Sequence, residues 1–164
     1  MGKETVLKSL ENAVQFERDA YDYYSSALEK TRNPDAKNMF EILIEEEKKH
    51  AEYLTFLKNR LESRGELDTE STVDLDRDFK RLFLEQADRI DDNVKVESSE
   101  IEALSFAIDM ERKGMDMYKD LAEKASTDEE KHMFSRLADW EKGHMEFIQD
   151  YYDYFQDHGM FTDE

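Results

Sequence analysis

The sequence predicts an all-α fold built around four long helices. Gly and Pro are scarce, with five and one in 164 residues, and long stretches are rich in Glu, Lys, Leu and Ala, which favour helix. Along four segments the apolar residues recur in alternating steps of three and four, the spacing of one helical face. A hydrophobic content of 38% with 40% charged residues also fits amphipathic helices better than a sheet buried on both faces.

The first two helices are predicted at about residues 5–30 and 34–64. The second follows Asn33-Pro34, an N-cap residue with proline at the first helical position, and ends near Gly65. The stripe of the first helix is Val6, Leu10, Ala13, Glu17, Ala20, Tyr24 and Leu28, and that of the second is Phe40, Leu43, Glu47, His50, Leu54 and Leu57.

The third helix is predicted to start at Ser99, where Glu102 completes a capping box, and the fourth at Thr127, where Glu130 completes another. Their stripes are Ile101, Leu104, Ile108, Glu111, Met115, Tyr118 and Ala122, then Phe134, Leu137, Glu141, His144, Ile148 and Tyr151. An aromatic tail is expected to extend the fourth helix and to cover a neighbouring element or a dimer partner: Tyr151, Tyr152, Tyr154 and Phe155.

A long connection separates the second helix from the third. An apolar spacing within it predicts a short amphipathic helix, from Leu75, Phe79, Leu82, Phe83 and Gln86. We therefore expect a single domain over residues 1–164, with hairpin 1 at about 4–64, a crossover at about 65–98 and hairpin 2 at about 99–157. Two antiparallel helical hairpins joined by one long crossover form a ferritin-like four-helix bundle.

An internal repeat supports the two-hairpin organisation. When the chain is shifted by 94 positions, residues 16–54 align without a gap on residues 110–148, and 14 of the 39 positions are identical. The identities include Glu17 with Glu111, Tyr24 with Tyr118, Glu47 with Glu141, and His50 with His144. The molecule is therefore predicted to consist of two copies of one hairpin.

Six polar residues interrupt the apolar stripes: Glu17, Glu47, His50, Glu111, Glu141 and His144. Helical residues three apart share a face, so each Glu-x-x-His pair can hold one ion. One Glu from each of two helices, with Glu-x-x-His from each of the other two, is the ligand set of di-iron and di-manganese bundles. Glu47 and Glu141 are the candidates for bridging two metals.

Electrostatics favours a metal site over an empty polar core. A buried carboxylate is costly unless it is paired, and two divalent cations would neutralise four carboxylates. These ligands suit iron or manganese, and they also accept zinc. The alternative is that glutamates reach solvent at a helix edge and histidines are ordinary core residues. A third Glu-x-x-His match, Glu129 with His132, lies off the stripe and is interpreted as a solvated helix start.

Two tyrosines follow the first-helix glutamates of each hairpin by two turns. Tyr24 and Tyr118 are candidates for hydrogen bonds to ligand carboxylates across the bundle. The alternative is a core tyrosine whose hydroxyl lies at the bundle edge. No further catalytic residue is expected beyond the metal centre.

Composition excludes several classes of function. A net charge of −19 argues against nucleic-acid binding, which needs clustered Lys and Arg. The absence of cysteine excludes disulfides and thiolate metal sites. No apolar run approaches the about 20 residues of a membrane span, and the N-terminus lacks a signal-peptide core, so a cytoplasmic protein without membrane contact is expected.

The segments "FERDAYDYY", "EEEKKHAEYL", "MERKGMDMY" and "WEKGHMEFI" resemble the rubrerythrin-like branch of the ferritin-like superfamily. The resemblance covers both hairpins and implies a di-iron site with the same six residues as ligands. It also implies redox chemistry with peroxide or dioxygen, and often a dimer.

The chain departs from that family pattern in two respects. Rubrerythrins carry a further glutamate one turn after the third-helix ligand, where this sequence has Gly114. They also carry a cysteine-ligated iron that supplies electrons, which this cysteine-free chain cannot hold. Turnover would then need an external electron-donor protein, or it would consume iron(II) itself.

Three functions are compatible with these features. The leading hypothesis is a di-iron oxidoreductase of peroxidase, oxidase or ferroxidase type that reacts with hydrogen peroxide or dioxygen. The second is ferritin-like metal binding or iron sequestration without redox turnover, which the negative charge would favour. The third is a metal-free bundle that acts as a binding module.

Overall fold

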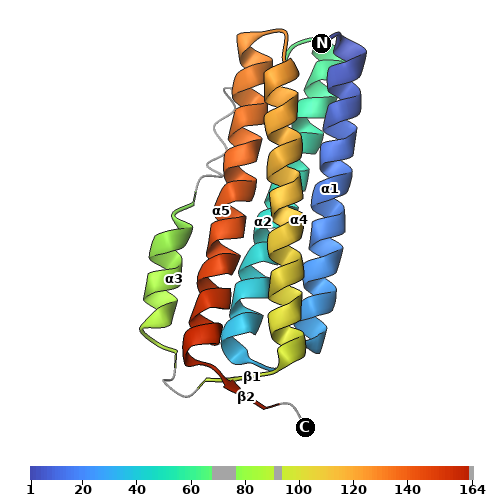
Figure 1. Ribbon diagram of the computed structural model, residues 1–164. Helices are drawn as coiled ribbons and strands as arrows, with labels where there is room; N and C mark the ends of the chain where they lie inside the picture. The colour runs from blue at the N-terminus through green and yellow to red at the C-terminus, as the bar shows by residue number, and fades with distance from the viewer. Residues whose placement is uncertain (68–76, 91–93, 163–164) are drawn as a thin grey trace.

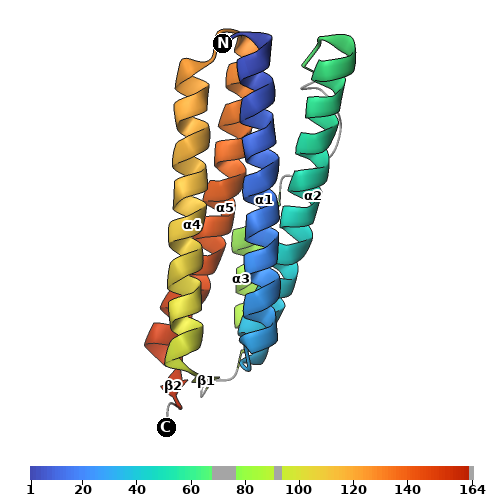
Figure 2. The ribbon, with the colours of Figure 1, turned by 90° about the vertical axis from the view of Figure 1, so that its right-hand side faces the viewer.

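Four long helices run along a common axis in the computed structural model, which describes residues 1–67, 77–90 and 94–162 (Figures 1 and 2). They are α1 (Lys3–Lys30), α2 (Pro34–Arg64), α4 (Ser98–Lys124) and α5 (Asp128–His158). A shorter helix, α3 (Phe79–Ala87), and two short strands, β1 (Lys95–Val96) and β2 (Met160–Phe161), complete the described elements. The predicted all-α bundle is confirmed.

The helices pair as two antiparallel hairpins. α1 packs along α2, and α4 packs along α5, with far fewer close approaches between the two pairs. The connection from α2 to α4 passes through α3 and β1, so that α2 and α4 run in the same direction (Figure 1). This is the topology of a bundle with one long crossover.

The ends of α2 follow the predicted cap chemistry. The Asn33 side-chain oxygen accepts hydrogen bonds from the N–H groups of Asp35 and Ala36, each at 2.9 Å. At the other end Gly65 has φ of 70°, a left-handed conformation that glycine adopts without steric cost. These caps fix the length of α2, on which Glu47 and His50 lie.

The predicted N-cap of α4, Ser99, is wrong by two residues, because a tertiary contact selects another capping box. The helix begins at Ser98, with Glu97 as N-cap and Glu100, not Glu102, completing the box. The Glu100 carboxylate accepts a hydrogen bond from the Glu97 N–H at 3.0 Å and others from the N–H groups of Arg32 and Asn33. Glu100 thereby joins the start of α4 to the α1–α2 turn.

The start of α5 is as predicted, with one difference in the box. Thr127 is the N-cap, and its Oγ1 accepts a hydrogen bond from the Glu130 N–H at 3.1 Å. The Glu130 carboxylate accepts from the Ser126 N–H, one residue before the N-cap, rather than from Thr127 itself.

The apolar core consists of two clusters at opposite ends of the bundle. We call the one near the N-terminus the upper cluster; its members include Val6, Leu10, Leu54, Leu57, Tyr118, Phe134 and Leu137. The lower cluster, near the β strands, includes Tyr24, Phe40, Leu43, Leu104, Phe147, Ile148, Tyr151 and Phe155. A polar layer lies between them, and it contains the candidate site.

The predicted short helix of the crossover is present as α3, although Leu75 lies outside the described residues. It lies against the outer side of α5 (Figure 1). Phe79 contacts Phe147 with ring centroids 5.1 Å apart, and Phe83 contacts Tyr151 at 5.2 Å. The aromatic tail of α5 therefore covers a neighbouring element of the same chain.

The two short strands join the crossover to the C-terminal tail. β1 and β2 pair in parallel, with Lys95 opposite Met160, a contact that the sequence did not indicate. In the part of the chain that the structure describes, no helix is long and apolar enough to cross a membrane.

Candidate metal centre

Six polar side chains meet in the layer between the two apolar clusters. Each of the four long helices contributes, and every member is at most 1% exposed: Glu17, Glu47, His50, Glu111, Glu141 and His144. We call this group the centre. Because the stripe of each helix turns these positions inward, the four helices bring together all six residues that the sequence singled out.

The two histidines occupy equivalent positions. His50 Nδ1 lies 3.8 Å from Glu17 Oε2, within hairpin 1, and His144 Nδ1 lies 3.6 Å from Glu111 Oε2, within hairpin 2. The imidazole rings lie nearly parallel, with centroids 4.9 Å apart and an interplanar angle of 7°. The repeat seen in the sequence is thus reproduced as an approximate symmetry of the centre.

Glu47 lies between the histidines of the two hairpins. Its Oε1 is 2.8 Å from His144 Nδ1, and its Oε2 is 4.0 Å from His50 Nδ1. One ligand atom from each of Glu47, His50, Glu141 and His144 can be chosen such that all lie within 4.8 Å of one another. Carboxylate and imidazole atoms this close form a donor set that fits a metal ion.

The hydrogen bonding of the centre is incomplete in a way that a metal would correct. Ten buried side-chain N or O atoms of the described residues lack a hydrogen-bond partner, and nine belong to these six residues. Buried polar atoms are normally hydrogen-bonded, and leaving one unpaired costs about 1–3 kcal/mol. The donor set therefore fits bound cations better than an empty polar core.

The pKa values of the four carboxyl groups differ by helix: they are raised on α2 and α5 and lowered on α1 and α4. Burial and the negative charges of Glu17 and Glu111 raise the pKa of Glu47 well above its usual value. The pKa of Glu141 is raised in the same way. Burial also raises the pKa of Glu17, but the neighbouring Glu47 carboxyl and His50 imidazole outweigh it and lower the pKa to about 2. The pKa of Glu111 is also lowered, against burial, by Glu141 and His144.

Two buried tyrosines hydrogen-bond to the ionised pair across the hairpins. The Tyr24 hydroxyl donates to Glu111 Oε1, and the Tyr118 hydroxyl donates to Glu17 Oε1 at 3.2 Å. Both side chains are fully buried, and burial is the largest cause that raises the pKa of each. Each hairpin thus supplies a neutral donor to the other hairpin's glutamate.

Sequence reasoning missed the aromatic surroundings of the histidines. The Trp140 ring stacks on His50, with centroids 4.4 Å apart at 17°, and Phe79 of the crossover meets His144 edge-on at 5.3 Å. The position of Trp140 directly before Glu141 was a signal available in the sequence. The contact from Phe79 depends on how the crossover folds, so no local pattern indicated it.

The departure at Gly114 has a steric explanation. A Cβ atom there would lie 2.5 Å from Cζ of Phe16 and 2.7 Å from its Cε1, which is too close unless the Phe16 ring moves. Phe16, from α1, fills the space next to Glu141 that a residue at position 114 would need. The Phe16 ring therefore occupies the space that a glutamate at position 114 would need.

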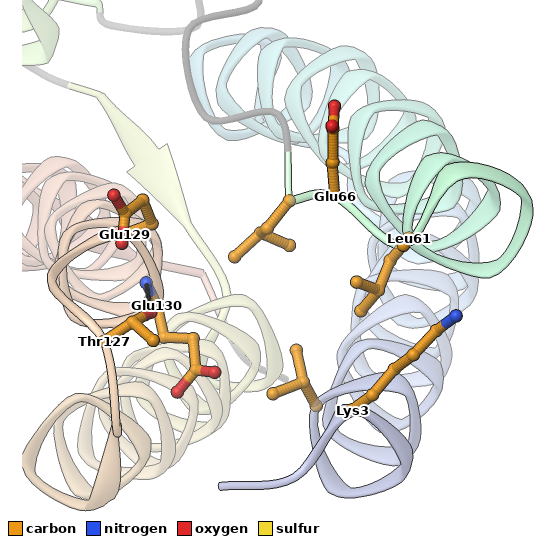
Figure 3. Close-up of a pocket in the computed structure, with 9 residues that line it drawn as sticks. Lys3, Leu61, Glu66, Thr127, Glu129 and Glu130 are labelled. Carbon is orange, nitrogen blue, oxygen red and sulfur yellow. Dashed lines mark hydrogen bonds between the residues drawn. The ribbon is translucent and has the colours of Figure 1, made fainter.

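The third Glu-x-x-His match lies away from the centre, as interpreted from the sequence. Glu129 and Glu130 line a pocket of about 490 Å³ between the start of α5 and the ends of α1 and α2 (Figure 3). Lys3, Leu61 and Glu66 also lie around it in that view. The Glu130 carboxylate already accepts a hydrogen bond, so this acidic pocket lacks the unpaired buried atoms of the centre.

Comparison with known protein families agrees with the fold. The family model described as Rubrerythrin matches residues 8–152, a span that contains all four long helices in large part and the whole centre. No curated protein and no solved structure matches the chain.

Proposed function

The chain belongs to the rubrerythrin family, and from this premise we propose that it is a di-iron oxidoreductase that reacts with hydrogen peroxide or dioxygen. The proposed ligands are Glu17, Glu47, His50, Glu111, Glu141 and His144. The observation that carries the proposal is the set of nine unpartnered, buried nitrogen and oxygen atoms on these six residues.

The protein's part in this function is to hold a compact donor set in a dry layer. The upper and lower clusters exclude water from both ends, which strengthens the attraction between carboxylates and cations. Glu47, placed between the two histidines, is the proposed bridge, and Glu141 is its counterpart on hairpin 2. Tyr24 and Tyr118 orient the proposed terminal carboxylates through their hydrogen bonds.

Charge balance supports two divalent ions. Four carboxylates that become ionised on metal binding carry four negative charges, which two divalent cations neutralise. Glu47 and Glu141, whose raised pKa values favour the protonated form, would release their protons as metal binds. When bound, two ferrous ions would supply the electrons that reduce the oxidant. Since the chain has no cysteine, re-reduction would depend on an external donor.

The test begins with metal content. The protein purified after expression in iron-supplemented medium is expected to contain about two iron atoms per chain by elemental mass spectrometry, in line with two-metal sites. Anaerobically loaded iron(II) protein should then develop the absorption of an oxidised iron centre within seconds of adding peroxide or dioxygen. Glu47→Gln and Glu141→Gln should each reduce the metal content, since neutral amides cannot balance the cations.

The outcomes separate the alternatives. Bound iron(II) that stays ferrous with both oxidants would contradict the redox function and favour metal binding without turnover. Large particles in light scattering would favour sequestration, whereas the homodimer expected from the family resemblance would not. A folded protein that takes up no iron, manganese or zinc would leave a metal-free binding module.

A further inference from the structure

A groove on the outer face of hairpin 1 ends at the centre. It lies between α1 and α2, has a volume of about 440 Å³, and is lined by Glu47 together with Arg18, Tyr21, Lys48, Ala51 and Thr55. Glu47 is the proposed bridging ligand, and both of its buried carboxylate oxygens lack hydrogen-bond partners. The wall of the groove thus includes a fully buried residue that the centre leaves unsatisfied.

The equivalent face of hairpin 2 is covered by larger apolar side chains. In the repeat, Ala51 corresponds to Met145 and Tyr21 to Met115. Met145 packs against both the upper and the lower cluster, so it spans the polar layer from outside. Met115 is buried in the upper cluster, whereas Tyr21 is 37% exposed. Met145 and Met115 therefore shield Glu141, whereas a groove leads toward Glu47.

Charges at the groove indicate what kind of molecule would pass. Arg18 and Lys48 are exposed and line it together with two acidic residues, Glu52 and the buried Glu47. The lining therefore has no excess of acidic residues, in contrast to the net charge of −19 for the whole chain. A mouth without that negative excess does not repel small neutral molecules or small anions.

We propose that this groove is the route by which a small neutral or anionic ligand, of the size of hydrogen peroxide, reaches the centre, and that Ala51 keeps it open. The inference rests on the proposed metal function, and it adds which of the two proposed bridging glutamates the ligand approaches. Hairpin 1 admits the ligand at Glu47, whereas Met145 covers the equivalent Glu141 on hairpin 2.

The test uses azide as the probe and cobalt(II)-loaded protein, so that binding is read from the cobalt absorption without any turnover. Ala51→Met copies into hairpin 1 the residue that hairpin 2 has at the equivalent position. Stopped-flow mixing should show azide association and dissociation slowed together by about tenfold, because an obstacle in the path raises the barrier for both directions. The equilibrium affinity for azide should not change.

Two further variants keep the test decisive if Ala51→Met folds poorly. Met145→Ala should open the second face and accelerate azide exchange, while Thr55→Gln, which copies Gln149, should slow it. In every variant the cobalt affinity, followed by quenching of Trp140 beside His50, should match the parent. Trp140 is the single tryptophan of the chain, so its fluorescence reports the centre alone.

The measurements distinguish a failure of the proposed access route from a failure of the proposed metal function. Normal cobalt binding with azide rates that no variant changes would overturn the route through this groove and leave the metal function standing. A parent protein that does not bind cobalt would overturn the metal function, and the route with it. An azide affinity that falls in Ala51→Met at an unchanged association rate would mean that Ala51 touches bound azide, and would also overturn a role in access.

Discussion

Hairpin 1 has an ion pair, and hairpin 2 an indole ring, at the same repeat position beside the centre. The position is Glu46 in α2, buried and joined to Arg77 of the crossover at 2.7 Å. Its equivalent in α5 is Trp140, which stacks on His50 of the opposite hairpin. The six residues of the centre keep the repeat, whereas this neighbouring position does not.

The difference teaches which part of the repeat the proposed chemistry constrains. Two equivalent metals need two equivalent donor sets, so the carboxylates, histidines and tyrosines recur at a spacing of 94. Some surrounding positions, such as Glu46 and Trp140, differ and give each side its own environment. The groove on hairpin 1 and the covered face of hairpin 2 are one result of such differences.

The largest expected effect is the dependence of the free energy of unfolding on pH, and it tests the residues that the two hairpins share. In the folded metal-free protein the pKa values of Glu47 and Glu141 are raised above the usual 4.5. A raised pKa stabilises the fold below 4.5, and this contribution is lost as pH rises toward the raised value. The free energy of unfolding should therefore fall by up to about 1.4 kcal/mol per pH unit for each retained proton. Urea unfolding of metal-free protein between pH 5 and 8 measures it.

The matched variants are Glu47→Gln and Glu141→Gln, which should each remove a similar part of that slope. His144, whose pKa is raised by Glu111 against the opposing effect of burial, adds to the same trend and remains in both variants. A slope that depends on only one of the two glutamates would break the equivalence of the hairpins. The lowered pKa of Glu17, about 2, acts oppositely: its contribution is lost as pH falls from 4.5 toward 2.

The next effect concerns steric space that the two hairpins fill differently. Gly114→Glu would drive a side chain into the ring of Phe16 and should lower the free energy of unfolding by about 3 kcal/mol. Phe16→Ala should make room, so the double variant should be less destabilised than the sum of the single changes. Urea unfolding of all four proteins gives this coupling directly. Strictly additive losses would mean that Phe16 does not exclude the side chain.

A third prediction returns to the equivalent parts of the hairpins. Tyr24→Phe and Tyr118→Phe each remove a hydrogen bond to a buried, ionised carboxylate. Each should destabilise the metal-free protein by about 1.5–3 kcal/mol, and the two losses should be alike, as should the fall in cobalt(II) affinity. A loss confined to one variant would show that only one tyrosine supports the centre.

The sequence was sufficient for the features that the 3.6-residue period and the repeat encode. Four helices, their hairpin pairing and the inward direction of Glu17, Glu47, His50, Glu111, Glu141 and His144 all follow from local spacing. Asn33 and Gly65 also marked the ends of α2 correctly, because cap chemistry is local.

What the sequence could not provide depends on contacts between distant segments. The capping box of α4 shifted to Glu97 and Glu100 because Glu100 also binds the α1–α2 turn. The approach of Phe79 to His144 and of Arg77 to Glu46 requires the folded crossover. Likewise, the fit of Phe16 against Gly114 appears only when α1 and α4 are placed side by side.

The smallest expected effect probes the ion pair with which the comparison began. Arg77→Met removes the cation that contacts Glu46 Oε1, while Lys49 remains 4.0 Å from the same oxygen. Breaking a fully buried pair costs about 3–5 kcal/mol, but the Arg77 side chain is 40% exposed, and solvent screening reduces this. We therefore expect a loss of about 1 kcal/mol in the free energy of unfolding.

The control acts on Trp140, the residue of hairpin 2 that is equivalent to Glu46. Arg136 lies over the Trp140 ring, with its Cζ 5.6 Å from the centroid, and Arg136→Met should cost about 0.5 kcal/mol, since an exposed cation–π contact is weak. High salt should reduce the loss in Arg77→Met, because screening weakens the ion pair between Arg77 and Glu46. No loss in Arg77→Met, or a loss that salt does not change, would mean that Glu46 does not depend on Arg77. The two hairpins would then differ beside the centre in shape alone, and not in charge.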